Sequence, residues 1–326
     1  MLSFLSSFST SFLAAVLIWP FLAAALTLPI LIMQYRRYNK VSFGRSALIY
    51  IFILYALVLV SFTLYPMPDD PVAFCTAYQL SPVLNPLVAI MDIRTDGMRA
   101  VLQLAMNVAF FVPFGILARI LFGWKFWRTV LGSFLLSLAV EIAQLTGAFG
   151  LYPCSYRLFD VNDLIVNTLG GMVGFGLAML IPKREIERAE KDAAVRQAGL
   201  LRMMVALVID QIIAIGLAIA VLVAVYLFIN KDIAMDVRDW VNVGVLLVVH
   251  IMIPYIARGW SIGSRMVRFN HDDKRRSFIR RTLFYVLRAA YLWLLFLSSN
   301  GLITLLVVVV TLVVWAKWKR LPYQII

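Results

Sequence analysis

The sequence predicts an all-α, polytopic membrane protein with about nine transmembrane helices in two bundles. Hydrophobic residues make up 63% of its 326 residues and charged residues only 14%, whereas soluble domains are nearer half apolar and a quarter charged. The apolar residues fall in runs of about 20, which is the helix length that spans about 30 Å of hydrocarbon. These runs lack the alternation of apolar and polar residues that marks the strands of a membrane barrel.

Each apolar run is interpreted as one membrane-spanning helix. The runs are at about residues 12–33, 46–65, 100–122, 127–147, 161–182, 203–229, 240–257, 282–298 and 300–316. No basic segment precedes the first run, and it continues to Met33. We therefore interpret it as a span and not as a cleaved signal peptide.

The positive charge predicts the orientation of these helices. The formal net charge is +13, and with nine spans 24 of the 30 Lys and Arg residues fall in loops on one side, against five on the other. Cytoplasmic loops carry the excess of Lys and Arg. We therefore expect the N-terminus outside and the C-terminus in the cytoplasm. We therefore interpret the basic charge as a topology signal that also attracts anionic lipid, and not as a nucleic-acid-binding surface.

A charged stretch at 183–201 separates two modules. Glu187 with Lys191, and Asp192 with Arg196, form oppositely charged pairs four residues apart, which favours a short cytoplasmic helix. The predicted organisation is a five-helix module over 1–182, this helical linker, and a four-helix module over 202–326.

The longest loop on the outer side, residues 66–98, is expected to form an ordered cap. Its five prolines prevent one continuous helix, and loops of this length are usually functional or disordered. Cys75 lies in this loop and Cys154 in the next outer loop, where disulfides persist. We expect a bond between them; the alternative is two free thiols.

Polar side chains recur at one depth in three of the expected helices. They are Asn107, Glu141, Gln144, Asp163 and Asn167. At 1.5 Å per residue, Asn107 lies about 13 Å, Glu141 about 9 Å and Asn167 about 10 Å from the outer end of its helix. Asp160, Asp163 and Asn167 share one helix face. Such groups are costly in hydrocarbon, so their common depth suggests a built polar site.

Arg157 precedes this face and completes the candidate site. It either pairs with Glu141 or an aspartate, or binds a lipid phosphate through its planar guanidinium. Single amides in membrane bundles often serve only to join helices, at about 0.6 kcal/mol each, but that role does not require three carboxyl groups beside an arginine. The predicted binding residues are Asn107, Glu141, Gln144, Arg157, Asp160, Asp163 and Asn167.

The chain resembles the VanZ-like family at these residues. The matching segments begin at Asn107 (NVAFFVPFG), Glu141 (EIAQ) and Arg157 (RLFDVNDLIVNTLGG), and the resemblance covers about 45–182. It implies a bacterial protein of the cytoplasmic (inner) membrane that acts on the outer leaflet or cell envelope. The family's name-giving member is associated with low-level resistance to glycopeptide antibiotics, chiefly teicoplanin.

The C-terminal module resembles an RDD-family domain. Arg202 and Asp210 match its opening motif (LLRMMVALVID), and the segment from Trp260 resembles the one after its second span, but the later Asp-containing motif is missing. The expected partner of Asp210 is Arg202, with Arg265 and Arg288 as alternatives. Such an ion pair either fixes packing or serves a proton- or sodium-coupled transport step.

Three functions remain open at this point. The first is binding or moving a cell-envelope lipid, either an anionic lipid or a lipid-linked precursor. The second is a membrane-embedded hydrolase or transferase that uses Glu141, Asp160 and Asp163, although no nucleophile is evident. The third is a ligand-free scaffold whose protein partner is unspecified. No metal or cofactor is expected, because His250 and His271 lack ligand spacing and no phosphate-loop or dinucleotide motif occurs.

Overall fold

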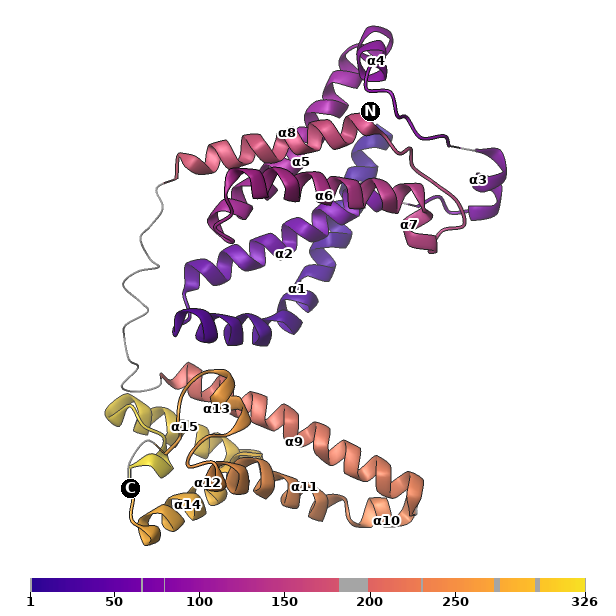
Figure 1. Cartoon of the computed structure of the whole chain (residues 1–326). Coiled ribbons are helices and arrows are strands. Elements are labelled where there is room, and N and C mark those ends of the chain that lie inside the picture. The colour runs from indigo at the N-terminus through magenta and orange to yellow at the C-terminus, as the bar shows by residue number, and fades with distance from the viewer. Residues whose placement is uncertain are drawn as a thin grey trace. The chain divides into compact units, whose positions relative to one another are not determined.

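The computed structural model describes residues 2–65, 67–78, 80–181, 199–229, 231–272, 276–296 and 300–325. Within these ranges the regular structure is entirely helical (Figure 1), and the one β-type pairing is an isolated bridge between Val83 and Asp160. Most of the linker helix expected at 183–201 lies outside the described residues.

Eight described helices are long and apolar enough to cross a membrane, which confirms the polytopic all-α class. They are Phe12–Tyr38, Phe43–Leu64, Met98–Ile120, Phe126–Leu145, Val161–Met179, Leu200–Phe228, Arg238–Ile256 and Gly301–Trp318. The remaining expected span corresponds to helix α14 (Phe278–Phe296), which is not among these eight. It carries Arg280, Arg281 and Arg288, and arginine is costly in hydrocarbon.

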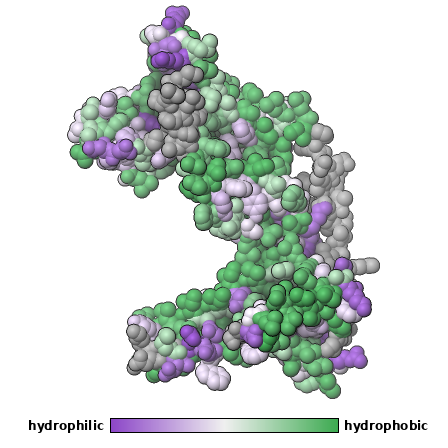
Figure 2. All heavy atoms as spheres, turned by 180° about the vertical axis from the view of Figure 1, so that it is seen from behind, coloured by the Kyte–Doolittle hydropathy of each residue, from purple (hydrophilic) through white to green (hydrophobic). Residues whose placement is uncertain are grey.

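The chain divides into two compact units. The first comprises residues 1–27 and 42–185, and the second comprises residues 28–41 and 186–326. Helix α1 (Leu2–Tyr38) therefore contributes its last turns to the second unit. Hydrophobic side chains cover most of the surface visible in Figure 2, and large ones such as Phe21 and Trp240 are more than three-quarters exposed. Apolar surface of this extent is expected where helices face lipid.

The first unit is built around three long helices. After α2 (Phe43–Leu64) come the short helices α3 (Pro71–Ala77) and α4 (Val88–Asp96), and then α5 (Met98–Ile120), α6 (Phe126–Leu145), α7 (Gly147–Gly150) and α8 (Val161–Met179). Helix α8 packs against both α5 and α6. Glycines bring the backbones of α5 and α8 into contact, since a Cβ at Gly170 would lie 2.2 Å from the Val108 carbonyl oxygen and one at Gly174 2.0 Å from that of Val112.

These contacts also set the relative direction of α5 and α8. Position 108 meets position 170, and position 112 meets position 174, so the two helices run parallel. Their N-terminal halves, which carry Asn107 and Asp163, therefore lie at the same end of the bundle.

The second unit surrounds α9 (Leu200–Phe228). Its other elements are α10 (Lys231–Asp236), α11 (Arg238–Leu247), the π-helical turn η1 (Val248–Met252), α12 (Ile253–Ile256), α13 (Ile262–Met266), α14, α15 (Gly301–Trp318) and the 3-10 turn η2 (Pro322–Gln324). The π-helical turn lies just before Pro254, which cannot donate a backbone hydrogen bond. The buried core of this unit includes Ala206, Val267 and Phe284.

Candidate functional site

An amide and a carboxylate from two parallel helices form a half-buried part of the candidate site. The Asn107 side chain on α5 donates from Nδ2 to Asp163 Oδ1 on α8, at 2.6 Å. Both residues are half-buried. The structure therefore brings together two of the residues predicted from their common depth, and leaves part of each open to the surroundings of the helices.

Glu141 on α6 anchors the start of α8. Its side chain is 1% exposed, and its Oε2 accepts a hydrogen bond from the backbone N–H of Asp160 at 2.9 Å. Asp160 is the N-cap residue of α8, and its Oδ1 accepts from the Asn162 backbone N–H at 2.8 Å. An N-cap satisfies a backbone donor that the first helical turn leaves unpaired. Glu141 and Asp160 thus fix the position of the first turn of α8, which carries Asp163.

A serine that the sequence interpretation missed links the deeper part of the site. Asn167 Nδ2 donates to Ser137 Oγ at 2.9 Å, and Ser137 Oγ donates to the Asp163 carbonyl oxygen at 3.5 Å. We call the six residues joined in this way the polar cluster. It consists of Asn107, Ser137, Glu141, Asp160, Asp163 and Asn167.

The sequence did contain a signal for Ser137. Thr129, Ser133, Ser137 and Glu141 follow one another at four-residue spacing, so they share one face of α6. None of the four is more than 1% exposed. A repeated hydroxyl at this spacing in an apolar run indicates a face packed against another helix, and that helix is α8.

Arg157 hydrogen-bonds none of the carboxyl groups of the described residues, so the first of its two expected roles, pairing with Glu141 or an aspartate, is not observed. Its guanidinium donates to the carbonyl oxygens of Phe62 and Tyr65, each at 3.3 Å. These carbonyls belong to the end of α2, where the last helical turn has no intrahelical donors. Burial lowers the pKa of Arg157, yet an arginine remains charged in proteins. The side chain therefore caps α2.

Gln144 also faces α2 and not the polar cluster. Its Nε2 donates to the Thr63 carbonyl oxygen at 2.9 Å. The Tyr156 hydroxyl donates to the Leu64 carbonyl oxygen, also at the end of α2, at 2.8 Å. The predicted site is thus divided. Five of its seven residues belong to the polar cluster. The other two, Gln144 and Arg157, hydrogen-bond the end of α2.

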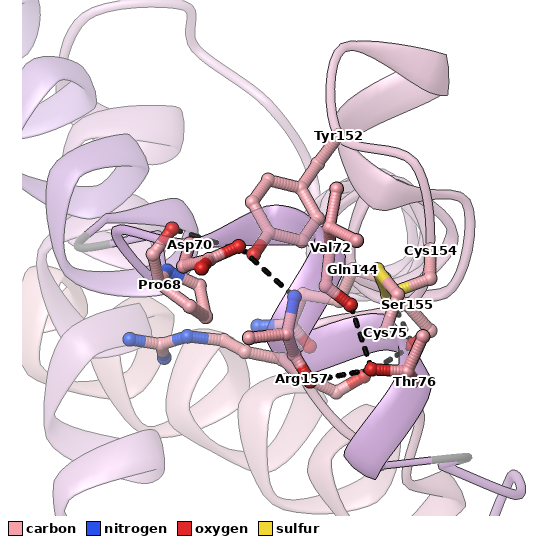
Figure 3. Close-up of a disulfide and its surroundings, with 11 residues drawn as sticks. Pro68, Asp70, Val72, Cys75, Thr76, Gln144, Tyr152, Cys154, Ser155 and Arg157 are labelled. Atoms are coloured by element: carbon pink, nitrogen blue, oxygen red, sulfur yellow. Dashed lines mark hydrogen bonds between the residues drawn. A yellow bond between two sulfur atoms is a disulfide. The ribbon is translucent and has the colours of Figure 1, made fainter.

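The segment between α2 and α5 is joined at three points to the loop that precedes α8. A disulfide links Cys75 on α3 to Cys154, and the Tyr152 hydroxyl donates to the Pro68 carbonyl oxygen at 3.3 Å (Figure 3). Farther along, the Val83 backbone N–H donates to the Phe159 carbonyl oxygen at 2.8 Å. This last contact forms the bridge beside Asp160. The segment therefore constrains the loop that leads into the N-cap of α8.

In the second unit the expected ion pair between Arg202 and Asp210 is not formed. Arg202 donates to the backbone carbonyls of Asn39 and Arg268, and its guanidinium carbon lies 4.7 Å from the centroid of the Tyr35 ring. Asp210 Oδ1 accepts from the Gly263 backbone N–H at 2.6 Å. The two residues are eight positions apart on one helix, α9, a rise of about 12 Å, so their side chains do not meet.

The comparison with known proteins concerns the first unit. A model of the VanZ/LLP1 family matches residues 52–182, a range that contains the whole polar cluster. Protein VanZ of Enterococcus faecium is 28% identical over 156 residues, which is 48% of this chain and 87% of that protein. No solved structure matches the chain significantly. The chain therefore carries a VanZ-like domain over residues 52–182, with weak homology to VanZ itself.

Proposed function

We propose that the VanZ-like domain binds the head group of a cell-envelope lipid in the outer leaflet and shields or moves it. Tolerance to glycopeptide antibiotics of the teicoplanin type would follow. The observation that carries the proposal is the half-buried Asn107–Asp163 pair within membrane-spanning helices. Polar groups in spans are usually enclosed by protein, whereas this pair is partly open.

The charge of the polar cluster favours one part of such a lipid. The cluster contains three carboxyl groups, and Asp160 and Asp163 lie close enough to Glu141 for their charges to interact. It contains no basic side chain, because Arg157 is engaged by α2. Carboxylates repel phosphate and accept hydrogen bonds from hydroxyl, amide and ammonium groups. The preferred ligand is therefore the donor-rich portion of a lipid-linked envelope precursor, not the phosphate of a simple anionic lipid.

The alternative of a membrane-embedded hydrolase or transferase is less well supported. Asp160 is used as an N-cap, Glu141 holds the Asp160 N–H, and the Ser137 hydroxyl is engaged by Asn167 and by a backbone carbonyl. A nucleophile needs an adjacent base that can accept its proton, and Ser137 has no carboxylate among its hydrogen-bond partners here. Incubation of purified protein with envelope lipid in liposomes would reveal turnover if this alternative held.

The proposal is tested by removing the charge of Asp163 while keeping its shape. We expect Asp163→Asn protein to accumulate and to unfold at the wild-type temperature, but to lose the teicoplanin tolerance that the wild-type protein confers on a susceptible host. Native mass spectrometry of gently solubilised protein should show a co-purifying lipid in the wild type and less of it in the variant.

The matched control is Asp96→Asn, which removes an exposed carboxylate at the end of α4 in the same domain. It should leave both tolerance and lipid binding unchanged. Wild-type tolerance and lipid content in the Asp163→Asn protein would show that the polar cluster only joins helices.

A further inference from the structure

The last turns of helix α1 have one face that is apolar at its start and basic at its end. Five residues at i, i+3, i+4, i+7 and i+8 spacing share this face. They are Pro29, Ile32, Met33, Arg36 and Arg37. The opposite side of α1 carries Gln34, which is fully buried, and Tyr35, which belongs to the core of the second unit. That side holds α1 in place and leaves the first face available to a ligand.

This face and one residue of α13 line an open groove of about 600 Å³. Its apolar wall consists of Pro29, Ile32, Met33 and Met266, and its basic end consists of Arg36 and Arg37. All of these residues belong to the second unit. The volume lies within the range of about 300–1,000 Å³ that is usual for small-molecule sites. The groove therefore has room for a ligand that is apolar along most of its length and charged at one end.

The positive charge at the basic end is not balanced by acidic residues of the segments that line the groove. Residues 28–41 and 257–271 contain no aspartate or glutamate. The second segment adds Arg265 and Arg268, which are exposed and flank Met266 in the sequence. Arg36 and Arg37 are themselves exposed, and neither forms an ion pair with a described acidic side chain. An anionic ligand would therefore complement this end of the groove.

The position of the groove along α1 matches the layers of a membrane. The segment Phe12–Tyr38 has the length and hydropathy of a membrane span, and Arg36 and Arg37 lie in its last turn. Pro29 precedes Arg36 by seven residues, which places it about 10 Å deeper along the helix. A phospholipid has the same order, with a charged head group at the membrane surface and acyl chains in the hydrocarbon. The two parts of the groove therefore correspond to the two parts of such a lipid.

We propose that this groove binds an anionic phospholipid, whose phosphate lies on Arg36 and Arg37 and one of whose acyl chains lies along the apolar wall. Guanidinium groups form short, charge-assisted hydrogen bonds to phosphate. Basic pockets beside membrane helices are typical sites for anionic head groups. The groove lies outside the VanZ-like domain at 52–182, so this proposal does not depend on the function of the polar cluster.

The experiment titrates the purified full-length protein in detergent with phosphatidylglycerol, and separately with zwitterionic phosphatidylcholine, and counts bound lipid by native mass spectrometry. The wild type should bind its first phosphatidylglycerol more tightly than phosphatidylcholine. Arg36→Gln/Arg37→Gln should weaken phosphatidylglycerol binding by about tenfold or more, because each basic residue near a head group adds to the attraction.

The matched control is Lys317→Gln/Lys319→Gln. It also removes two exposed positive charges at the end of a membrane-spanning helix, α15, of the same unit. The Lys317 ammonium lies over the ring of the next residue, Trp318, as the Arg37 guanidinium lies over that of Tyr38. Neither lysine lines the groove, so this variant should keep the wild-type affinity for phosphatidylglycerol.

Met33→Trp provides a second variant that fills the apolar wall and keeps both arginines. It should weaken phosphatidylglycerol binding without any change of charge, and it tests the proposal if the arginine variant does not fold. Met204→Trp is its control, because Met204 on α9 is 53% exposed, close to the 46% of Met33, and does not line the groove.

Three results would overturn the proposal. The first is equal affinity of the wild type for the two lipids. The second is wild-type binding of phosphatidylglycerol by both groove variants, Arg36→Gln/Arg37→Gln and Met33→Trp. The third is an equal loss in the lysine variant and the arginine variant, which would show that the lipid responds to the net charge and not to the groove.

Discussion

The disulfide between Cys75 and Cys154 should stabilise the VanZ-like domain by joining two segments that are distant in sequence. The cysteines are separated by 79 residues. Closing a loop of this length in a fully flexible chain corresponds to about 4.5 kcal/mol in the chain-entropy relation. Helices α5 and α6 lie inside the loop and are expected to remain helical in the unfolded membrane-bound state. The loop is then less flexible, so we expect the free energy of unfolding to fall by about 2–4 kcal/mol.

The assay compares the wild type with the Cys75→Ser/Cys154→Ser double variant, with and without reductant. Thermal unfolding in detergent should show a lower midpoint for the double variant. Reductant should lower the wild-type midpoint to the same value and leave the double variant unchanged. Hydrogen exchange should increase in α3 and in the loop before α8, because the disulfide links them. Equal midpoints and equal exchange in the two proteins would refute the reasoning.

Two further predictions concern packing and pH. Gly174→Leu should destabilise the first unit by about 1–3 kcal/mol, because a Cβ at this position would lie 2.0 Å from the Val112 carbonyl oxygen. Gly176→Leu is the control and should be tolerated, because a Cβ at Gly176 would meet nothing within 4 Å. Similar unfolding midpoints for the two variants would contradict the close contact at Gly174. Burial lowers the pKa of His271 well below 6.5, so unfolding adds a proton at low pH. Stability should fall below about pH 6.5, by up to about 1.4 kcal/mol per unit. His271→Gln should reduce this slope in pH-dependent unfolding, and an unchanged slope would show that His271 is not the titrating group.

The positions of the helices followed from local sequence patterns. Runs of apolar residues predicted nine spans, and eight of them are helices of membrane-spanning length and composition. The segment at 282–298 was more ambiguous because it overlaps α14, which carries three arginines. Hydrophobicity averaged over a window does not show whether such arginines face lipid or protein. In the structure Arg288 is fully buried.

The polar cluster was predicted in part. The common depth of Asn107, Glu141, Asp163 and Asn167 followed from counting residues along regular helices, because the rise per residue is constant. Their hydrogen bonds did not follow, since these depend on how each helix is rotated toward its neighbour. Ser137 was missed because one serine in an apolar run carries little signal, although its four-residue spacing from Glu141 placed it on the same face.

The charged side chains were the least predictable. Arg157 was expected either beside a carboxylate or on a lipid phosphate, but it caps α2. Arg202 was expected as the partner of Asp210, with Arg265 and Arg288 as alternatives, but it binds backbone carbonyls of other segments. The place of Arg157 just before the polar helix face suggested the first pairing, and the resemblance to the RDD family suggested the second. A long arginine side chain can hydrogen-bond any acceptor within its reach, including the backbone carbonyls at helix ends. Which acceptors lie within reach is decided only when the helices have packed together.

By itself the sequence determined the class of protein, the location of most helices and the positions of the polar residues along them, because each depends on composition and on the regular rise of a helix. Only the tertiary structure decided which polar atoms meet. It placed Asn107 against Asp163, the Glu141 carboxylate against the N-cap of α8, and the buried guanidinium of Arg288 over the Tyr323 ring. Those contacts join residues far apart in the chain, and the packing of whole helices selects them.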